Sequence, residues 1–260
     1  MRTQEKLAQN KAVGKDSLIG YFPLGYPSLT ESIEAAVAMV EEGVDVLELG
    51  IPYSDPVMDG LVIQEATEQA LQSGFKLSQV FSAVEQVAKR TSAPVLVMTY
   101  WNPVLQFGVE KFAKELKQAG GAGLITPDLI PDEAGDWLKV SDELELDRVF
   151  LATPSSTPSR VKRAADLSRG FVYAVSTMGI TGERGQVDLL ARKVVSSIRA
   201  EAPTALTAVG IGISSGEQAS AVNEYADGAI VGSAFVRAYQ DNGLDGLRQK
   251  VRDIVSGLNK

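Results

Sequence analysis

The sequence predicts a single-domain α/β protein that folds as a (β/α)8 barrel. Short apolar runs of β-type residues alternate with segments of helical periodicity, and eight such pairs follow one another. The 260 residues match the roughly 250 that are typical of one barrel. No linker-like change in composition interrupts the alternation, so we expect residues 1–260 to form one domain.

The eight expected strands are residues 17–24, 44–51, 94–100, 122–125, 148–152, 171–176, 205–209 and 228–231. The helices after them are expected to begin near residues 28, 77, 109, 132, 159, 188, 214 and 243. In the first helix, Ser28 and Glu31 form a capping box and Gly43 suits the C-terminal cap. A doubly wound open sheet is the alternative, but it would carry a glycine fingerprint where this chain has FPLGYP at 22–27.

Two connections are longer than a barrel requires. An extra helix, 62–73, lies between the second strand and its own helix, and a glycine-containing polar loop follows the sixth strand at 176–186. Irregular loops at the carboxyl ends of barrel strands commonly carry the chemistry. We therefore expect the loop after strand six to be a mobile lid, with a plain linker as the alternative.

Composition excludes several function classes. The net charge of −8 argues against nucleic acid as a partner, and the absence of cysteine excludes disulfides and thiolate chemistry. Because histidine is also absent, acid–base work falls to Asp, Glu, Lys or Tyr, and a histidine triad or zinc site is excluded. Residues 1–16 are polar without a signal-peptide core, and no apolar run approaches a membrane span, so we expect a cytoplasmic protein without membrane contact.

A carboxylate inside an apolar strand is the sharpest chemical feature. Glu48 lies near the end of the run 44–49, and the loop after it holds Asp55 and Asp59. Burying a charge in a strand costs several kcal/mol unless it is paired or its pKa changes. Glu48 is therefore either a catalytic group or a structural acid bound by the backbone or a lysine, and Asp59 either a second catalytic group or a helix cap.

The ends of the last two strands predict an anion site. The seventh strand ends in GIGISS at 210–215, and the eighth ends in Gly232 and Ser233 just before a helix. Glycines let backbone N–H groups approach an anion, while serine hydroxyls and helix N-termini add favourable interactions. Each cluster alone is typical of a tight turn, but the pair fits the phosphate site that many barrels build from these two loops.

Motifs spread over the whole chain resemble those of one known family. These are FPLGYP at 22–27, ELGIPYSDPVMDG at 48–60 followed by Ile63-Gln64, MTYWNP at 98–103, TPDLIP at 126–131, GITG at 179–182 and the glycine-rich ends of the last two strands. In this order they are similar to the tryptophan synthase α subunit family. The resemblance implies a lyase of tryptophan biosynthesis that cleaves indole-3-glycerol phosphate to indole and glyceraldehyde 3-phosphate by a retro-aldol reaction.

The resemblance also implies the site residues. It makes Glu48 the group that protonates the indole ring and removes the hydroxyl proton, and Asp59 the acceptor of the indole N–H. It implies substrate contacts from Tyr21, Tyr100, Tyr173, Thr181, Gly182, Gly212, Gly232 and Ser233. It places Asp55, Pro56 and Asp128 where the family meets or senses its β subunit in an α2β2 heterotetramer. Neither a metal nor an organic cofactor is implied.

Two residues depart from the family pattern, Met58 beside Asp59 and Leu61. Leu61 stands where a proline is usual, and we expect it to be exposed and to loosen the loop that carries Asp59. Two other functions therefore stay open at this point. One is a catalytically weak subunit that mainly binds and activates the β partner. The other is a different phosphate-binding barrel, such as a sugar-phosphate isomerase.

Overall fold

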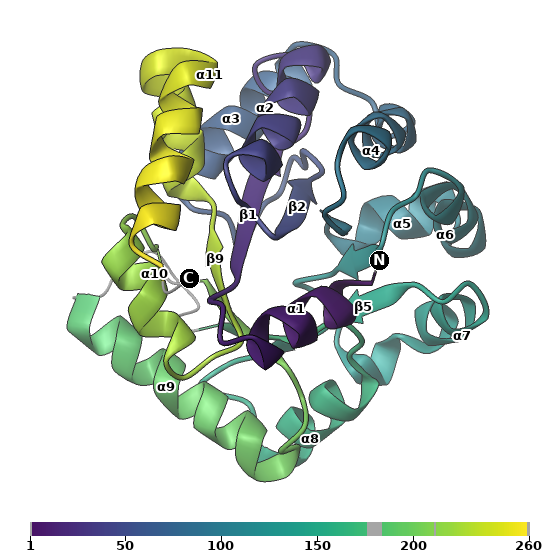
Figure 1. Cartoon of the computed structure of the whole chain (residues 1–260). Helices are drawn as coiled ribbons and strands as arrows, with labels where there is room; N and C mark the ends of the chain where they lie inside the picture. Colours follow the sequence, from purple (N-terminus) through teal and green to yellow (C-terminus); the bar gives the residue numbers. More distant parts are fainter. Residues whose placement is uncertain (1, 176–183, 211, 259–260) are drawn as a thin grey trace.

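In the computed structural model, which describes residues 2–175, 184–210 and 212–258, nine parallel strands form one sheet ringed by helices (Figure 1). The strands are β1 Leu18–Pro23, β2 Val46–Gly50, β3 Val95–Met98, β4 Gly123–Ile125, β5 Asp147–Val149, β6 Leu151–Ala152, β7 Val172–Val175, β8 Thr207–Gly210 and β9 Gly228–Val231. The predicted α/β barrel is confirmed, since each expected strand is present at its predicted place.

The sheet closes through its fifth predicted strand. The strand order is β5-β4-β3-β2-β1-β9-β8-β7-β6, so β5 and β6 lie at the two ends of the order. Only Phe150 separates them along the chain, and its carbonyl accepts a hydrogen bond from the Tyr173 N–H at 3.0 Å. The segment predicted as one strand, 148–152, is thus two short strands that pair with different neighbours and complete a ring of eight.

The helices are α1 Thr3–Ala12, α2 Leu29–Glu41, α3 Leu61–Gln72, α4 Gln79–Arg90, α5 Trp101–Phe107, α6 Val109–Gln118, α7 Gly135–Glu143, α8 Pro158–Leu167, α9 Arg184–Glu201, α10 Gly216–Asn223 and α11 Ser233–Ser256, with a 3-10 turn at Pro131–Glu133. The extra helix after the second strand is α3, as predicted. In α2 the predicted N-cap is confirmed, because the Ser28 hydroxyl accepts from the Glu31 N–H, and Gly43 after the helix has a φ of +115°. The Glu31 carboxylate accepts from the Ser28 hydroxyl at 2.7 Å, so only the Ser28 half of the predicted capping box is present.

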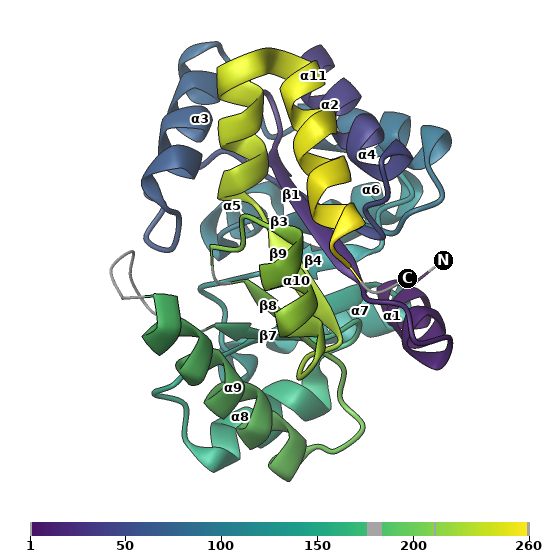
Figure 2. The same ribbon diagram turned by 60° about the vertical axis from the view of Figure 1, so that its left-hand side comes forward.

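Three helical segments were not predicted. They are α1, α5 and the first half of α11, up to a break at Asn242 and Gly243 where the backbone leaves helical geometry. The helix expected from residue 243 is the second half of α11. Its two halves fold back on each other, as the upper part of Figure 2 shows.

The interior of the barrel begins with a layer of apolar side chains closed by α1. Leu7 of α1 is fully buried and packs with this layer, whose members are Ile19, Val46, Leu96, Ile125, Val149, Phe171, Ala208 and Ile230. Figure 2 shows α1 beside the start of β1, at one end of the barrel. Ion pairs hold it there, since Lys11 Nζ lies 2.6 Å from Asp227 and Lys15 Nζ, in the segment after α1, lies 2.5 Å from Asp45. The polar segment 1–16 thus contains the plug of the barrel.

Within the described ranges, no helix combines the length and the apolar character needed to cross a bilayer.

Candidate active site

Five of the positions that continue the barrel interior towards the carboxyl ends of the strands carry a polar side chain or none. Because side chains alternate along a strand, the residue two positions beyond each inner-layer residue points into the same interior. These second-layer residues include Tyr21, Glu48, Tyr173, Gly210 and Gly232. Tyr21 and Glu48 lie opposite each other in the pairing of β1 with β2. The fold therefore brings five positions on or beside five strands to one end of the barrel, and four of them, Tyr21, Glu48, Tyr173 and Gly232, are residues that the sequence singled out.

Glu48 is buried without a partner for one of its oxygens. Its side chain is 1% exposed, and Oε2 has no hydrogen-bond partner within the part of the chain that the structure describes. Burial is the main cause that raises the pKa of Glu48 to about 8, and the nearby negative charge of Asp59 raises it further. A structural carboxylate bound by the backbone or a lysine would have a lowered pKa and satisfied oxygens. The geometry favours a group that holds a proton near neutral pH.

Asp59 lies in the loop between β2 and α3, close enough to affect Glu48. Burial raises the pKa of Asp59 to about 6, although a hydrogen bond from Tyr100 lowers it. The Tyr100 hydroxyl donates to Asp59 Oδ1 at 3.4 Å, and the Gln64 side-chain amide donates to the Asp59 carbonyl oxygen at 2.7 Å. The N-cap of α3 is Gly60, which forms no side-chain cap bond, so the structure gives no support to a capping role for Asp59.

Tyr100 has a further role that its sequence position did not reveal. Its hydroxyl accepts a hydrogen bond from the Met58 N–H at 2.9 Å, and its ring stacks on Tyr53 with ring centroids 5.1 Å apart. It therefore fixes the loop that carries Asp59 as well as contacting the carboxylate. Only the tertiary structure shows these contacts, because Tyr100 and Asp59 lie 41 positions apart in the chain.

Two tyrosines, Tyr21, which is buried, and Tyr173, which is partly buried, line the same interior. Burial, together with the charges of Glu48 and Asp59, raises the pKa of Tyr21 and of Tyr173 well above the ordinary range, so both hydroxyls keep their protons. Each hydroxyl lies against a glycine. A Cβ at Gly50 would collide with the Tyr21 hydroxyl, and a Cβ at Gly210 would collide with the Tyr173 hydroxyl. Sequence reasoning gave Gly50 no role and treated Gly210 only as part of the glycine-rich anion motif, although both end a strand next to a tyrosine-bearing strand.

The predicted anion positions lie next to this interior. Gly212 has a φ of +66° with open space where a Cβ would be, and Gly232 is the N-cap of α11, where it offers no side chain to the first N–H groups. In contrast, Ser215 caps α10 by accepting from the Gln218 N–H. A Cβ built on Gly60 would lie 3.9 Å from the Ser233 hydroxyl oxygen, so the loop carrying Asp59 borders the start of α11. The structure thus brings the carboxylates and the proposed phosphate positions together.

Two predicted substrate contacts, Thr181 and Gly182, lie outside the described residues. The same is true of most of the loop expected to act as a lid, residues 176–186, of which the structure describes only the start of α9 at Arg184.

The residues expected to meet a partner lie at the same end of the barrel. Asp55 is exposed and accepts a hydrogen bond from the Ser54 hydroxyl at 2.6 Å, and Pro56 next to it is half-buried. Asp128 accepts from the Trp101 N–H at 2.9 Å and so caps α5. Burial raises the pKa of Asp128, and the hydrogen bond from the Trp101 N–H offsets part of this rise.

Large apolar side chains are exposed around these positions. Leu61 is 62% exposed, as predicted from its sequence position, and Val57 in the same loop is 78% exposed. Leu105 on α5 and Ile130 after β4 are also exposed. All four follow the carboxyl ends of three neighbouring strands, β2, β3 and β4. Apolar side chains gathered on one face indicate a surface that another protein covers.

Comparisons with known proteins agree on one family. The family model described as tryptophan synthase alpha chain matches residues 7–258. A tryptophan synthase alpha chain from Leifsonia xyli is 58% identical over 243 residues, which cover 94% of this chain and 93% of the relative. One from Mycobacterium intracellulare is 51% identical over 247 residues, or 95% and 90% of the two chains.

Solved structures give the same result. A chain of tryptophan synthase from M. tuberculosis, in its aminoacrylate-bound form, is similar with a TM-score of 0.92 and 44% identity, covering 99% of both chains. A chain of the tryptophan synthase complex from Pyrococcus furiosus has a TM-score of 0.83 and 34% identity, covering 93% of this chain and 99% of that one.

Proposed function

The chain belongs to the tryptophan synthase alpha chain family, and on this premise we propose that it cleaves indole-3-glycerol phosphate to indole and glyceraldehyde 3-phosphate. The observation that carries the residue roles is a pair of neighbouring acidic groups with raised pKa values, about 8 for the buried Glu48 and about 6 for the partly buried Asp59. Near pH 7 this pair offers one protonated acid and one carboxylate, which are the two forms that the reaction needs.

Glu48 acts first as an acid and then as a base. It gives its proton to C3 of the indole ring, which leaves the positive charge on the ring nitrogen. The Glu48 carboxylate then takes the proton of the hydroxyl on the glycerol carbon bonded to C3. The bond between that carbon and C3 breaks, its electron pair returns to the ring, and the glycerol carbon becomes the aldehyde. One proton is given and one is taken, so no oxidant or reductant is needed.

Asp59 stabilises the cationic ring between these two proton transfers. Its carboxylate accepts the indole N–H, and the charge that forms on the nitrogen strengthens this hydrogen bond. A fixed countercharge placed where charge develops is often the largest single contribution to catalysis. The bonds from Tyr100 and Gln64 hold the carboxylate and its loop in place, so little reorganisation is required during the reaction.

The remaining proposed contacts hold the two ends of the substrate. Tyr21, Tyr100 and Tyr173 form the wall of the indole pocket, while Gly212, Gly232 and Ser233 receive the phosphate through N–H groups and a hydroxyl. Thr181 and Gly182 complete this proposal as contacts from the loop after β7.

The chain works as the α subunit of a tryptophan synthase heterotetramer, with indole passed to the β subunit. The solved relatives are described as tryptophan synthase, and the P. furiosus one as a tryptophan synthase complex. The exposed apolar residues Val57, Leu61, Leu105 and Ile130 support a docking face beside the site. Asp55, Pro56 and Asp128 border that face, and we propose that they couple the partner to the loop of Asp59. We also propose that the protein acts in the cytoplasm.

Indole release tests the proposal. The purified chain is given indole-3-glycerol phosphate, and indole and glyceraldehyde 3-phosphate are measured, with and without a β subunit. Equal amounts of the two products support the lyase. A chain that binds a β subunit and stimulates it, yet releases no indole alone or in the complex, would instead be an activating subunit.

A further inference from the structure

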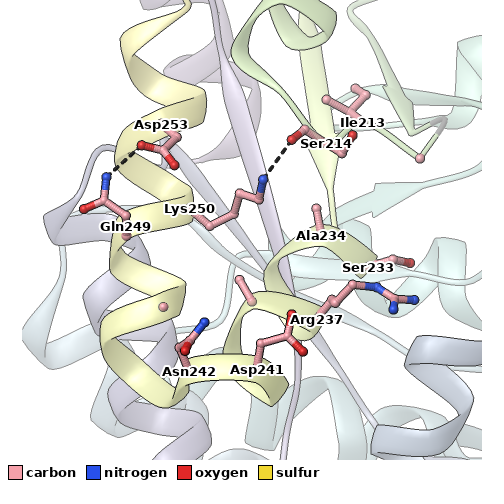
Figure 3. A pocket seen from close by; sticks show the side chains of 13 residues that line it. Ile213, Ser214, Ser233, Ala234, Arg237, Asp241, Asn242, Gln249, Lys250 and Asp253 are labelled. Carbon is pink, nitrogen blue, oxygen red and sulfur yellow. Dashed lines mark hydrogen bonds between the residues drawn. The ribbon is translucent and has the colours of Figure 1, made fainter.

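A hollow of about 560 Å³ lies outside the barrel, against the proposed phosphate positions (Figure 3). Residues 212–214 form one side of it, and the two halves of α11, folded back at Asn242 and Gly243, form the other. Gly212 and Ser233 belong to its lining, so the hollow opens onto the place where we expect the phosphate. Its charged lining residues are Arg237, Lys250, Asp241 and Asp253.

Of these charged side chains, two are held by neighbours. Lys250 Nζ donates to the Ser214 carbonyl oxygen at 3.1 Å, and Asp253 accepts from the Gln249 side-chain amide at 2.7 Å. Arg237 is exposed and forms no hydrogen bond or ion pair with any part of the chain that the structure describes. Its guanidinium can therefore bind a ligand without breaking a contact.

Helix geometry places Arg237 next to the proposed phosphate contact. Ser233 and Arg237 are four residues apart on α11, so they lie on the same face one turn apart. Figure 3 shows the guanidinium of Arg237 beside the side chain of Ser233. An anion bound at the N-terminus of α11 would thus meet backbone N–H groups, the Ser233 hydroxyl and a guanidinium from one short segment.

We propose that Arg237 is a specificity-determining residue that supplies the countercharge for the phosphate of the substrate. This proposal rests on the proposed function for the identity of the substrate, but its binding step can be tested separately. The guanidinium fork matches two phosphate oxygens and keeps its charge at every relevant pH, which a lysine amine does less well. The backbone groups position the phosphate, and Arg237 selects a charged substrate over one without phosphate.

Asp241 allows a substitution whose effect on anion binding should be opposite to that of replacing Arg237. It lies one further turn along the same helix face and lines the same hollow, with no ion pair to Arg237. Its negative charge opposes anion binding, so its removal should act in the opposite direction to removal of Arg237.

Calorimetry with inorganic phosphate and with glycerol 3-phosphate measures the binding step. We expect Arg237→Gln to weaken both about five- to tenfold, the range for a charge-assisted contact at a partly solvated site. Asp241→Asn should tighten both about twofold. The control is Arg199→Gln, which removes the same charge from an exposed position at the end of α9 and should leave binding unchanged.

Kinetics then separate specificity from chemistry. Arg237→Gln should raise KM for indole-3-glycerol phosphate by a similar factor while kcat changes less than about twofold, because the guanidinium does not touch the reacting atoms. Binding of indole, a probe without phosphate, should be unaffected.

Three outcomes are decisive. Unchanged phosphate binding in Arg237→Gln overturns the inference, and so does an equal loss in Arg199→Gln, since the effect would then be one of net charge. A protein that binds phosphate through Arg237 but releases no indole leaves this inference standing and removes the proposed function.

Discussion

Replacing Glu48 by glutamine should remove cleavage and at the same time change how stability depends on pH. An amide cannot shuttle a proton, and the loss of one acid–base group typically costs about 10²- to 10⁴-fold in rate. The stability effect follows from burial. Because the pKa of Glu48 rises from 4.5 to about 8 on folding, the folded state holds a proton that the unfolded chain has lost between these two pH values.

The sign of the stability effect follows from this difference in bound protons. Stability falls as pH rises wherever the folded state binds more protons than the unfolded state. The wild type should therefore lose stability from about pH 5 to pH 8, by roughly 4 kcal/mol at about 1.36 kcal/mol per pH unit. Glu48→Gln carries no ionisable group at this position and should lose less, so it should unfold at a higher temperature than the wild type at pH 8.5.

Two measurements check this prediction. Indole release gives the rate, and thermal unfolding at pH 5 and pH 8.5 gives the stability. The matched control is Glu65→Gln, an exposed position on α3 that should match the wild type in both. A Glu48→Gln protein with more than about half of the wild-type activity, or with the wild-type dependence of stability on pH, would show that Glu48 is a structural acid.

Three further substitutions test other parts of the structure. Leu7→Ala should destabilise the fold by about 2 to 5 kcal/mol, because the side chain is fully buried under the barrel. Val13→Ala, at a residue that is 77% exposed, should change stability by less than about 0.5 kcal/mol. Urea unfolding measures the stability of both variants. Tyr100→Phe removes a hydrogen bond that lowers the pKa of Asp59, so the acidic limb of the pH–rate profile should move to higher pH. Gly212→Leu should weaken glycerol 3-phosphate binding at least about tenfold in calorimetry, because a side chain in the open space beside the backbone blocks the anion; binding as tight as in the wild type would refute the placement.

The barrel could be predicted because its signal repeats. Eight alternations of strand and helix, each with its own periodicity and turn residues, agree with one another even where a single boundary is off by a few residues. The helix α3 was found for the same reason, since its apolar spacing stands out between two strands.

Elements with little local signal were missed. α1 is polar and places its one large apolar side chain, Leu7, in the core, so its sequence does not show the periodicity of a buried helix. α5 spans only seven residues and contains Pro103 near its start, which argues against a helix in the sequence. The division of the fifth strand at Phe150 depends on which neighbours β5 and β6 pair with, and this is a property of the closed ring.

In the candidate site, too, some residues could be predicted from the sequence and others could not. Glu48 could be found from the sequence because an acid in an apolar strand requires an explanation. The contact of Tyr100 with Met58 and the fit of Tyr21 over Gly50 join segments that are distant in the chain, and no local pattern encodes them. Arg237 was missed because a single arginine on an exposed helix face is ordinary until the fold places it beside Ser233.

The pH dependence of indole release by the wild type tests the central claim most directly. If Glu48 must begin protonated and Asp59 must be ionised, the rate should follow a bell with its maximum near pH 7. Its limbs should lie near pH 6 and pH 8, as apparent values of the interacting pair. A rate that stays level from pH 5 to pH 9 would contradict the assignment of the proton transfers to these two carboxyl groups.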